Sequence, residues 1–194
     1  MNPGPVLAVA PVPALALVLV LSAVAPRSAH AVDLGYAFGA GVTIPLSDDL
    51  SELAGPGPHV DLGLQYKLLD YFSLGVGLSL DFPIPEERAN GVTPDVYFVR
   101  ISGRAMLHHG FEWFRYWLSL DVGLAFNTLS TCNERGFCES TAETQAGFDV
   151  SGGLAFVVHK ELSIGPAVGI TFPEFREADT LYFVHVSLRA HWNL

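Results

Sequence analysis

The chain has few basic residues, few cysteines and no long apolar run in its main part. Lys and Arg total 10 against 20 Asp and Glu in 194 residues, so the net charge of −10 removes any electrostatic case for nucleic acid binding. After the first thirty positions no twenty consecutive residues are apolar, which argues against a transmembrane helix there. Two cysteines without a nearby histidine are too few for a zinc site. We therefore expect no metal and no cofactor.

Residues 1–31 are expected to form a signal peptide. The stretch Ala14–Ala25 is a short apolar core, and Ala29-His30-Ala31 has the small-x-small pattern that signal peptidase recognises, so cleavage is expected after Ala31. A membrane anchor over Val6–Ala25 is the alternative, although two prolines interrupt that helix. The remaining chain, residues 32–194, is expected to be a single domain.

An alternation of apolar and polar residues recurs eight times in this domain, with the period of two that a pleated strand imposes. The last repeat runs to the end of the chain, and an apolar strand there needs both of its edges paired. The sequence therefore predicts an all-β fold, an eight-stranded antiparallel up-and-down transmembrane β-barrel in which the last strand meets the first. The expected strands span residues 33–44, 59–68, 73–82, 95–107, 116–126, 145–156, 162–172 and 180–194.

The connections between these strands alternate in length. Short turns on one side and long, acidic loops on the other are typical of a barrel that crosses a membrane. The expected turns are residues 69–72, 108–115 and 158–161, and the expected loops are 45–58, 83–94, 127–143 and 173–179.

The large apolar side chains must face outward, because an eight-stranded barrel has an interior only just wide enough for its own side chains. A secreted β-sandwich also explains the alternation, but it does not explain two levels of outward aromatic residues, which indicate membrane interfaces. The first level, near the turns, contains Tyr36, Tyr66, Tyr116, Phe156 and Trp192; the second, near the loops, contains Phe82, Tyr97, Phe126, Phe172 and Tyr182.

With its export signal, eight strands, two aromatic belts and apolar terminal strand, the chain resembles the small outer-membrane β-barrel proteins of Gram-negative bacteria, the group with the A, X and W outer-membrane proteins. The resemblance covers residues 32–194. It implies a monomer in the cell outer membrane, surrounded by outer-membrane lipids. It also implies that the barrel assembly machinery recognises the terminal strand, which here ends Trp192-Asn193-Leu194 instead of in Phe or Trp.

The inward positions carry more charges than a narrow lumen can hold unpaired. Asp121 is expected opposite Asp149, next to Arg100 and Arg104 and across the lumen from Arg189. This set is read either as a plug of ion pairs that fills the barrel or as part of a narrow channel for small or hydrophobic solutes. Two further acids, Asp61 and Asp81, are expected one level higher without an obvious basic neighbour, where a cation or water could lie. The other inward residues are Lys67, His185 and His191.

The loops and the remaining motifs suggest no catalysis. The acidic loops are read as solvated tips, with divalent-cation bridging to lipid phosphates as the alternative. Cys132 and Cys138 in the third loop are expected to form a disulfide in an oxidising compartment. His185-x-Ser187 resembles the His and Ser of lipid A deacylases, but both face the lumen, so we expect no enzyme. His108-His109 is read as an interfacial anchor.

Overall fold

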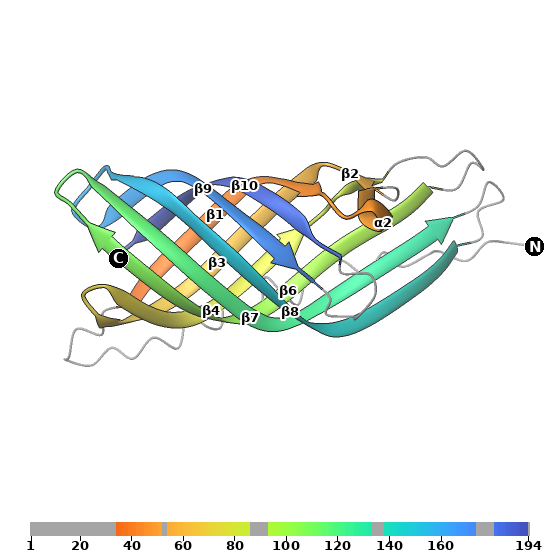
Figure 1. Ribbon diagram of the computed structural model, residues 1–194, viewed down its shortest axis with the longest axis horizontal. Helices are drawn as coiled ribbons and strands as arrows, with labels where there is room; N and C mark the ends of the chain where they lie inside the picture. Colours follow the sequence, from red (N-terminus) through yellow and green to blue (C-terminus); the bar gives the residue numbers. More distant parts are fainter. Residues whose placement is uncertain (1–33, 52–53, 86–92, 133–137, 174–180, 194) are drawn as a thin grey trace, which may run out of the picture. The chain divides into compact units, whose positions relative to one another are not determined.

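The computed structural model describes residues 34–51, 54–85, 93–132, 138–173 and 181–193, and eight of its strands form a closed barrel (Figure 1). The predicted fold class is confirmed. The expected signal peptide lies outside the described residues. Among the described residues no helix is long and apolar enough to cross a membrane. The barrel strands are β1 (Leu34–Pro45), β3 (Gly57–Leu69), β4 (Phe72–Asp81), β6 (Thr93–Gly110), β7 (Phe114–Cys132), β8 (Cys138–Val157), β9 (Leu162–Phe172) and β10 (Phe183–Trp192).

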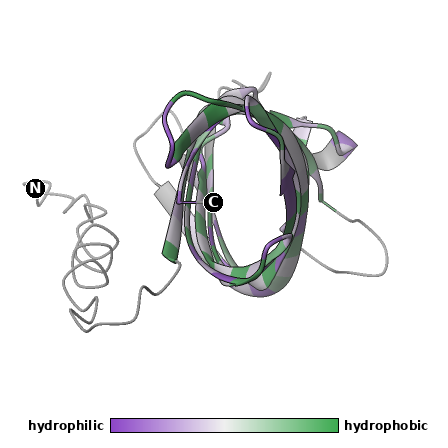
Figure 2. Cartoon of the chain, turned by 90° about the vertical axis from the view of Figure 1, so that its left-hand side faces the viewer, coloured by the Kyte–Doolittle hydropathy of each residue, from purple (hydrophilic) through white to green (hydrophobic). Residues whose placement is uncertain are grey.

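Each strand pairs antiparallel with its neighbours in the chain, and β1 closes the barrel by pairing with β10 from Tyr36–Trp192 to Pro45–Phe183. Viewed along its axis, the barrel is a continuous ring (Figure 2). Closure removes the open edges that would otherwise pair with other chains. The prediction that the terminal strand meets the first is confirmed.

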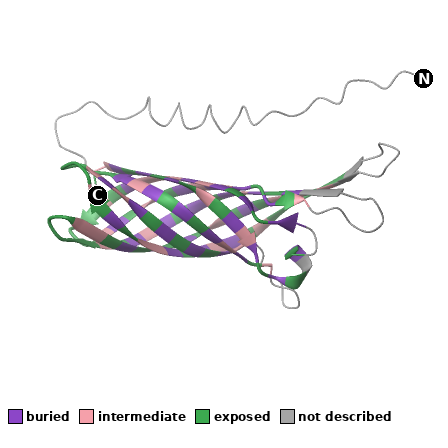
Figure 3. Ribbon diagram, turned by 90° about the horizontal axis from the view of Figure 1, so that it is seen from above, coloured by how far each residue is buried: buried purple, intermediate pink, exposed green. Residues whose placement is uncertain are grey.

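Buried and exposed residues alternate along the strands, so the barrel shows a chequered pattern (Figure 3). In β10 the residues at odd numbers from Phe183 to His191 are buried, whereas Leu188 on the outer face is 60 % exposed. The inner face is mostly polar and the outer face mostly apolar, the reverse of a soluble barrel. This arrangement suits a lipid environment, where the ladder satisfies the backbone and the outer side chains contact acyl chains.

The third long loop differs from the prediction. Residues 127–143 were expected to form a loop, but β7 continues to Cys132 and β8 begins at Cys138, paired throughout. We call this extension, residues 128–132 and 138–142, the projecting hairpin; β6 pairs with it from Thr93 (Figure 1). The apolar alternation ends near Phe126, but a ladder outside the membrane needs no apolar face, and the threonines here favour strands.

The first long loop contains structure that the sequence did not indicate. It holds the short helix α2 (Asp48–Ser51) and β2 (Ala54–Gly55), and β2 pairs with β5 (Ile84–Pro85) from the next connection. Leu50 of α2 is buried against the inward side chains Phe98 and Phe183. The loop therefore folds inward over the end of the lumen. We call the end of the barrel where the long connections lie the loop end. The opposite end, where the short connections lie, is the turn end.

The terminal strand is shorter than predicted. It stops at Trp192, because Asn193 has a φ of 57°, a left-handed conformation that asparagine tolerates better than most residues. The Asn193 N–H donates to the Glu161 carbonyl at 2.7 Å in the β8–β9 turn. The chain therefore leaves the ladder before its last residue.

Candidate functional site

Arginines and aspartates from six strands meet inside the barrel. The ladder places Asp121 of β7 opposite Asp149 of β8 on one side and opposite Arg104 of β6 on the other. These side chains point into the lumen because they occupy the same alternate positions in their strands as the other buried residues. The charged set comprises Arg100, Arg104, Arg189, Asp61, Asp81, Asp121 and Asp149, each at most 3 % exposed.

Arg104 lies at the centre of this set. Its Nη2 is 2.7 Å from Asp61 Oδ1 and 2.6 Å from Asp121 Oδ2, and its Nε also donates to both Asp121 oxygens. Two glycines leave room for the guanidinium: a Cβ at Gly63 would lie 2.5 Å from Arg104 Nη1, and one at Gly77 would lie 3.1 Å from Nη2. Arg104 of β6 thus joins its ladder neighbour β7 to β3, on the other side of β4, with charge-assisted hydrogen bonds.

Asp61 is held by a second arginine. Arg189 Nη2 of β10 lies 2.7 Å from Asp61 Oδ2, so this carboxylate accepts from two guanidinium groups. The expectation that Asp61 has no basic neighbour was wrong, because counting along one strand does not show which long side chains reach across the lumen. We call Arg104, Arg189, Asp61 and Asp121 the arginine cluster.

Two aspartate–histidine pairs lie next to it. His59 Nδ1 is 2.7 Å from Asp81 Oδ1, and His185 Nε2 is 2.7 Å from Asp149 Oδ2. The two imidazole rings stack with centroids 4.4 Å apart, and the Thr171 hydroxyl also donates to Asp149. Asp81, like Asp61, therefore has a partner that the sequence analysis missed. His59 could have been found, since it has the inward phase of Asp61. We call His59, Asp81, His185 and Asp149 the histidine cluster.

Arg100 joins the two clusters loosely. Its Nη2 donates to the Ser79 hydroxyl at 3.0 Å and lies 3.7 Å from Asp149 Oδ2. Ser79 in turn donates to Asp61 at 3.4 Å. The lumen set holds three arginines and four aspartates, so its formal charges nearly balance. Such balance is what buried charges require.

Apolar clusters lie toward both ends of the charged set. Toward the loop end, Leu50, Val96, Phe98 and Phe183 pack together, and toward the turn end Met106, Trp117 and Ala167 do so. Arg189 Cζ lies 4.4 Å from the centroid of the Trp117 ring, a cation–π contact. Trp117 was missed, although it shares the inward phase of Asp121 in β7. The charged groups are thus shielded from water along the lumen in both directions.

Of the other residues singled out from the sequence, Lys67 and Ser187 lie outside this network. Lys67 is 3.3 Å from Asp70 at the turn end, and both are partly or fully exposed. Within the described ranges, Ser187 Oγ and His185 Nδ1 have no hydrogen-bond partner, so these two side chains are not hydrogen-bonded to each other. The Cα atoms of Cys132 and Cys138 face each other in the ladder, but their side chains lie outside those described.

No protein-family model and no curated protein sequence matches this chain. Solved structures do resemble it. Neisserial surface protein A has a TM-score of 0.61 and 12 % identity over 84 % of this chain and 97 % of its own. A major outer membrane protein of Thermus thermophilus has a TM-score of 0.57 and 10 % identity, and the match covers 84 % of this chain and 99 % of that protein. Ail, the attachment invasion locus protein of Yersinia pestis, has a TM-score of 0.55 and 14 % identity, and the match covers 82 % of this chain and 96 % of that protein. The chain has the fold of small outer-membrane β-barrel proteins.

Proposed function

We propose that this protein is an integral outer-membrane barrel with a plugged lumen and a structural or surface-interaction role, and that it is neither a channel nor an enzyme. The fold and the outward apolar face support an outer-membrane location. The expected monomer is in keeping with closure of the barrel within one chain. The expected lipid contacts are in keeping with the exposed apolar side chains on its outer face.

One observation supports the plug: inside the lumen Arg104 contacts both Asp61 and Asp121, and all three residues are at most 2 % exposed. A permeating ion would have to break these contacts, and separating one partner from a buried ion pair costs about 3–5 kcal/mol. The apolar clusters toward both ends of the charged set oppose hydration of the lumen and so also oppose the passage of ions.

The loop end supports a surface role. The projecting hairpin extends the barrel on this side, and its described side chains, such as Ser140 and Thr141, are exposed. Two of the similar proteins are described as a surface protein and an attachment invasion locus protein. One structure of Ail holds the heparin analogue sucrose octasulfate, a polyanion. Because the loops of the present chain are rich in acids, we do not extend that ligand to it.

Conductance in a planar bilayer tests the plug. We expect the wild-type protein to give almost no steady current. The double variant R100S/R104S removes two cations and much bulk from the lumen, so it should pass cations. The matched control K160S removes a cation from the exposed β8–β9 turn and should stay silent. Regular, long-lived openings of a single size in the wild type would make the narrow channel the function.

Membrane location is tested separately. An outer-membrane fraction should contain the protein, and unheated and boiled samples should migrate differently on a gel because a folded barrel resists detergent. Recovery of all the protein in the soluble periplasmic fraction would exclude the proposal, whatever the conductance.

A further inference from the structure

A short segment covers the loop end of the lumen. It comprises residues 46–51, directly after the end of β1, and we call it the lid (Figure 1). Its helix α2 has four residues, too few to be stable without tertiary contacts. Leu50 supplies the apolar contact, since it is 1 % exposed and packs against the inward side chains Phe98 of β6 and Phe183 of β10. The closed position of the lid therefore depends on the burial of one leucine.

The hydrogen bonds between the lid and the barrel are long. The N–H groups of Leu46 and Ser47 both donate to the Tyr182 carbonyl, at 3.2 and 3.3 Å, and the Tyr182 N–H donates to Ser47 Oγ at 3.5 Å. Within the lid, by contrast, the Ser51 N–H donates to the Ser47 carbonyl at 2.9 Å, the usual length of such a bond. After the lid, β2 pairs with β5 through two residue pairs, and one of them contains Pro85, which has no N–H. The backbone therefore holds the lid weakly.

Unpaired polar atoms lie beneath the lid. Phe98 is opposite Asp81 in the β4–β6 ladder, and Phe183 is two residues from His185 in β10, so the apolar layer around Leu50 adjoins the histidine cluster. Buried polar groups are nearly always paired, so atoms here that lack a protein partner require water. Among the described residues, the buried atoms without a partner in this region are Thr43 Oγ1, His59 Nε2 and His185 Nδ1.

Two opposing contributions set the position of the lid. Closing it removes Leu50 from water, which stabilises the closed form. Closing also separates the three unpaired atoms from water, and a buried polar group without a partner costs free energy of a size similar to the gain from burying a leucine. Because the two contributions nearly cancel, the lid can open while the barrel stays folded. The arginine cluster lies farther from the lid than the histidine cluster, and its contacts among the described residues do not include the lid.

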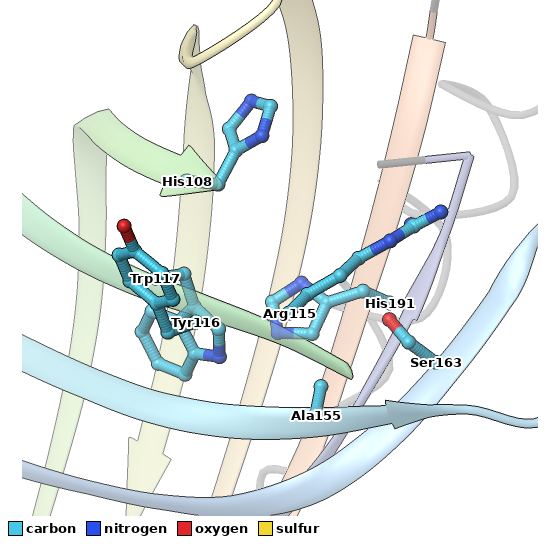
Figure 4. Close-up of a pocket in the computed structure, with 7 residues that line it drawn as sticks. All are labelled: His108, Arg115, Tyr116, Trp117, Ala155, Ser163 and His191. Atoms are coloured by element: carbon cyan, nitrogen blue, oxygen red, sulfur yellow. The ribbon is translucent and has the colours of Figure 1, made fainter. Parts of the chain in front are cut away.

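The turn end is built differently. A recess of about 10 Å³, roughly the room for one water, lies beside Ser163 and His191 (Figure 4). These two residues also have unpaired polar atoms, so here water has room without any movement of the chain. His108 borders the recess too, and its Nε2 is 2.9 Å from the Ser73 hydroxyl. His108 therefore faces inward, and its interpretation as an interfacial anchor was wrong.

We propose that the lid is a gate that opens and closes over the loop end and admits water to the histidine cluster. In the closed form Leu50 fills the space between Phe98 and Phe183. In the open form Leu50 leaves these rings, and water pairs with Thr43 and with the free ring nitrogens of the two histidines.

Cysteine labelling measures the opening. In the cysteine-free background C132S/C138S, T43C places a thiol beneath the lid, at a position that is 0 % exposed. A small, water-soluble methanethiosulfonate is added to the folded barrel in neutral detergent, and modification is followed by mass spectrometry. The thiol should react completely but slowly, because the reagent reaches it only when the lid opens. With L50S in addition, the rate should rise about tenfold or more, because serine gains little free energy by leaving water.

Two controls locate the effect. Leu46 belongs to the same segment but is 47 % exposed, so L46S should leave the T43C rate within about twofold. S163C places the thiol at the recess of the turn end instead, and L50S should not change its rate. Gel mobility of unheated samples checks that each variant is folded.

Three results would overturn the proposal. T43C could stay unmodified in the barrel with Leu50, which would mean that the lid does not open. L50S could leave the T43C rate unchanged, which would mean that Leu50 does not hold the lid closed. L50S could speed the labelling of T43C and S163C equally, which would indicate a general loosening of the barrel. Labelling is measured without a current, so failure of the lid and failure of the plug are separate results.

Discussion

The lumen and the projecting hairpin use the same strands β7 and β8, but different interactions hold them. In the lumen, side chains also join strands that do not share a ladder, as Arg104 of β6 does by contacting both its ladder partner Asp121 of β7 and Asp61 of β3. In the hairpin, residues 140–144 are exposed and the backbone ladder is the main described interaction. A substitution is therefore expected to lower the free energy of unfolding most where a side chain joins strands that are not neighbours. It should lower it least where the side chain is exposed and only the backbone pairs.

The largest effect is expected from R104Q. It leaves Asp61 and Asp121 with fewer donors in a buried site, which should lower the free energy of unfolding by about 3–5 kcal/mol. R100Q is the matched control inside the lumen, because among the described residues Arg100 makes one hydrogen bond, to Ser79, and a longer contact of 3.7 Å to Asp149. R100Q should lower the free energy of unfolding by about 1–2 kcal/mol. Urea unfolding of both variants in lipid vesicles measures the difference; equal losses would contradict the central role of Arg104.

Glycine substitutions should give an intermediate effect. G63A places a methyl group 2.5 Å from Arg104 Nη1, so the guanidinium must shift from its carboxylates, at a cost of about 1–3 kcal/mol. G103A faces outward, where the nearest heavy atom is 3.8 Å away, and should stay within about 1 kcal/mol of wild type. The unfolding midpoint of each variant measures this. A destabilised G103A would show that strand glycines matter for the ladder itself and not for the space they leave in the lumen.

The alternation of residues was enough to predict the barrel, its closure and which face turns inward, because a pleated strand allows only two faces and a narrow barrel cannot contain the large ones. It also identified the lumen charges. It could not reveal that Arg189 reaches Asp61, since the contact depends on side-chain length and barrel stagger. His59 and Trp117 also have the inward phase, but alternation alone does not show which inward side chains contact the charged set.

The sequence was least informative at the loop end. Apolar periodicity marks membrane depth and not strand length, so it predicts a loop where the strands of the projecting hairpin continue. The burial of Leu50 against Phe98 and Phe183 joins residues far apart in the chain, and no local pattern predicts such a contact.

The smallest effect is expected from C132S/C138S in the hairpin. The disulfide remains a prediction, and it is compatible with the ladder, which sets the two Cα atoms opposite each other as cross-strand bridges require. A bridge over so short a segment removes at most about 2 kcal/mol of chain entropy. Because the hairpin can open without the barrel, the double variant should keep the unfolding midpoint and the gel mobility of wild type. Protease should instead cut faster between residues 132 and 138. Thiol labelling of both cysteines in freshly isolated wild-type protein would exclude the bridge, and a large loss of barrel stability would show that hairpin and lumen unfold as one unit.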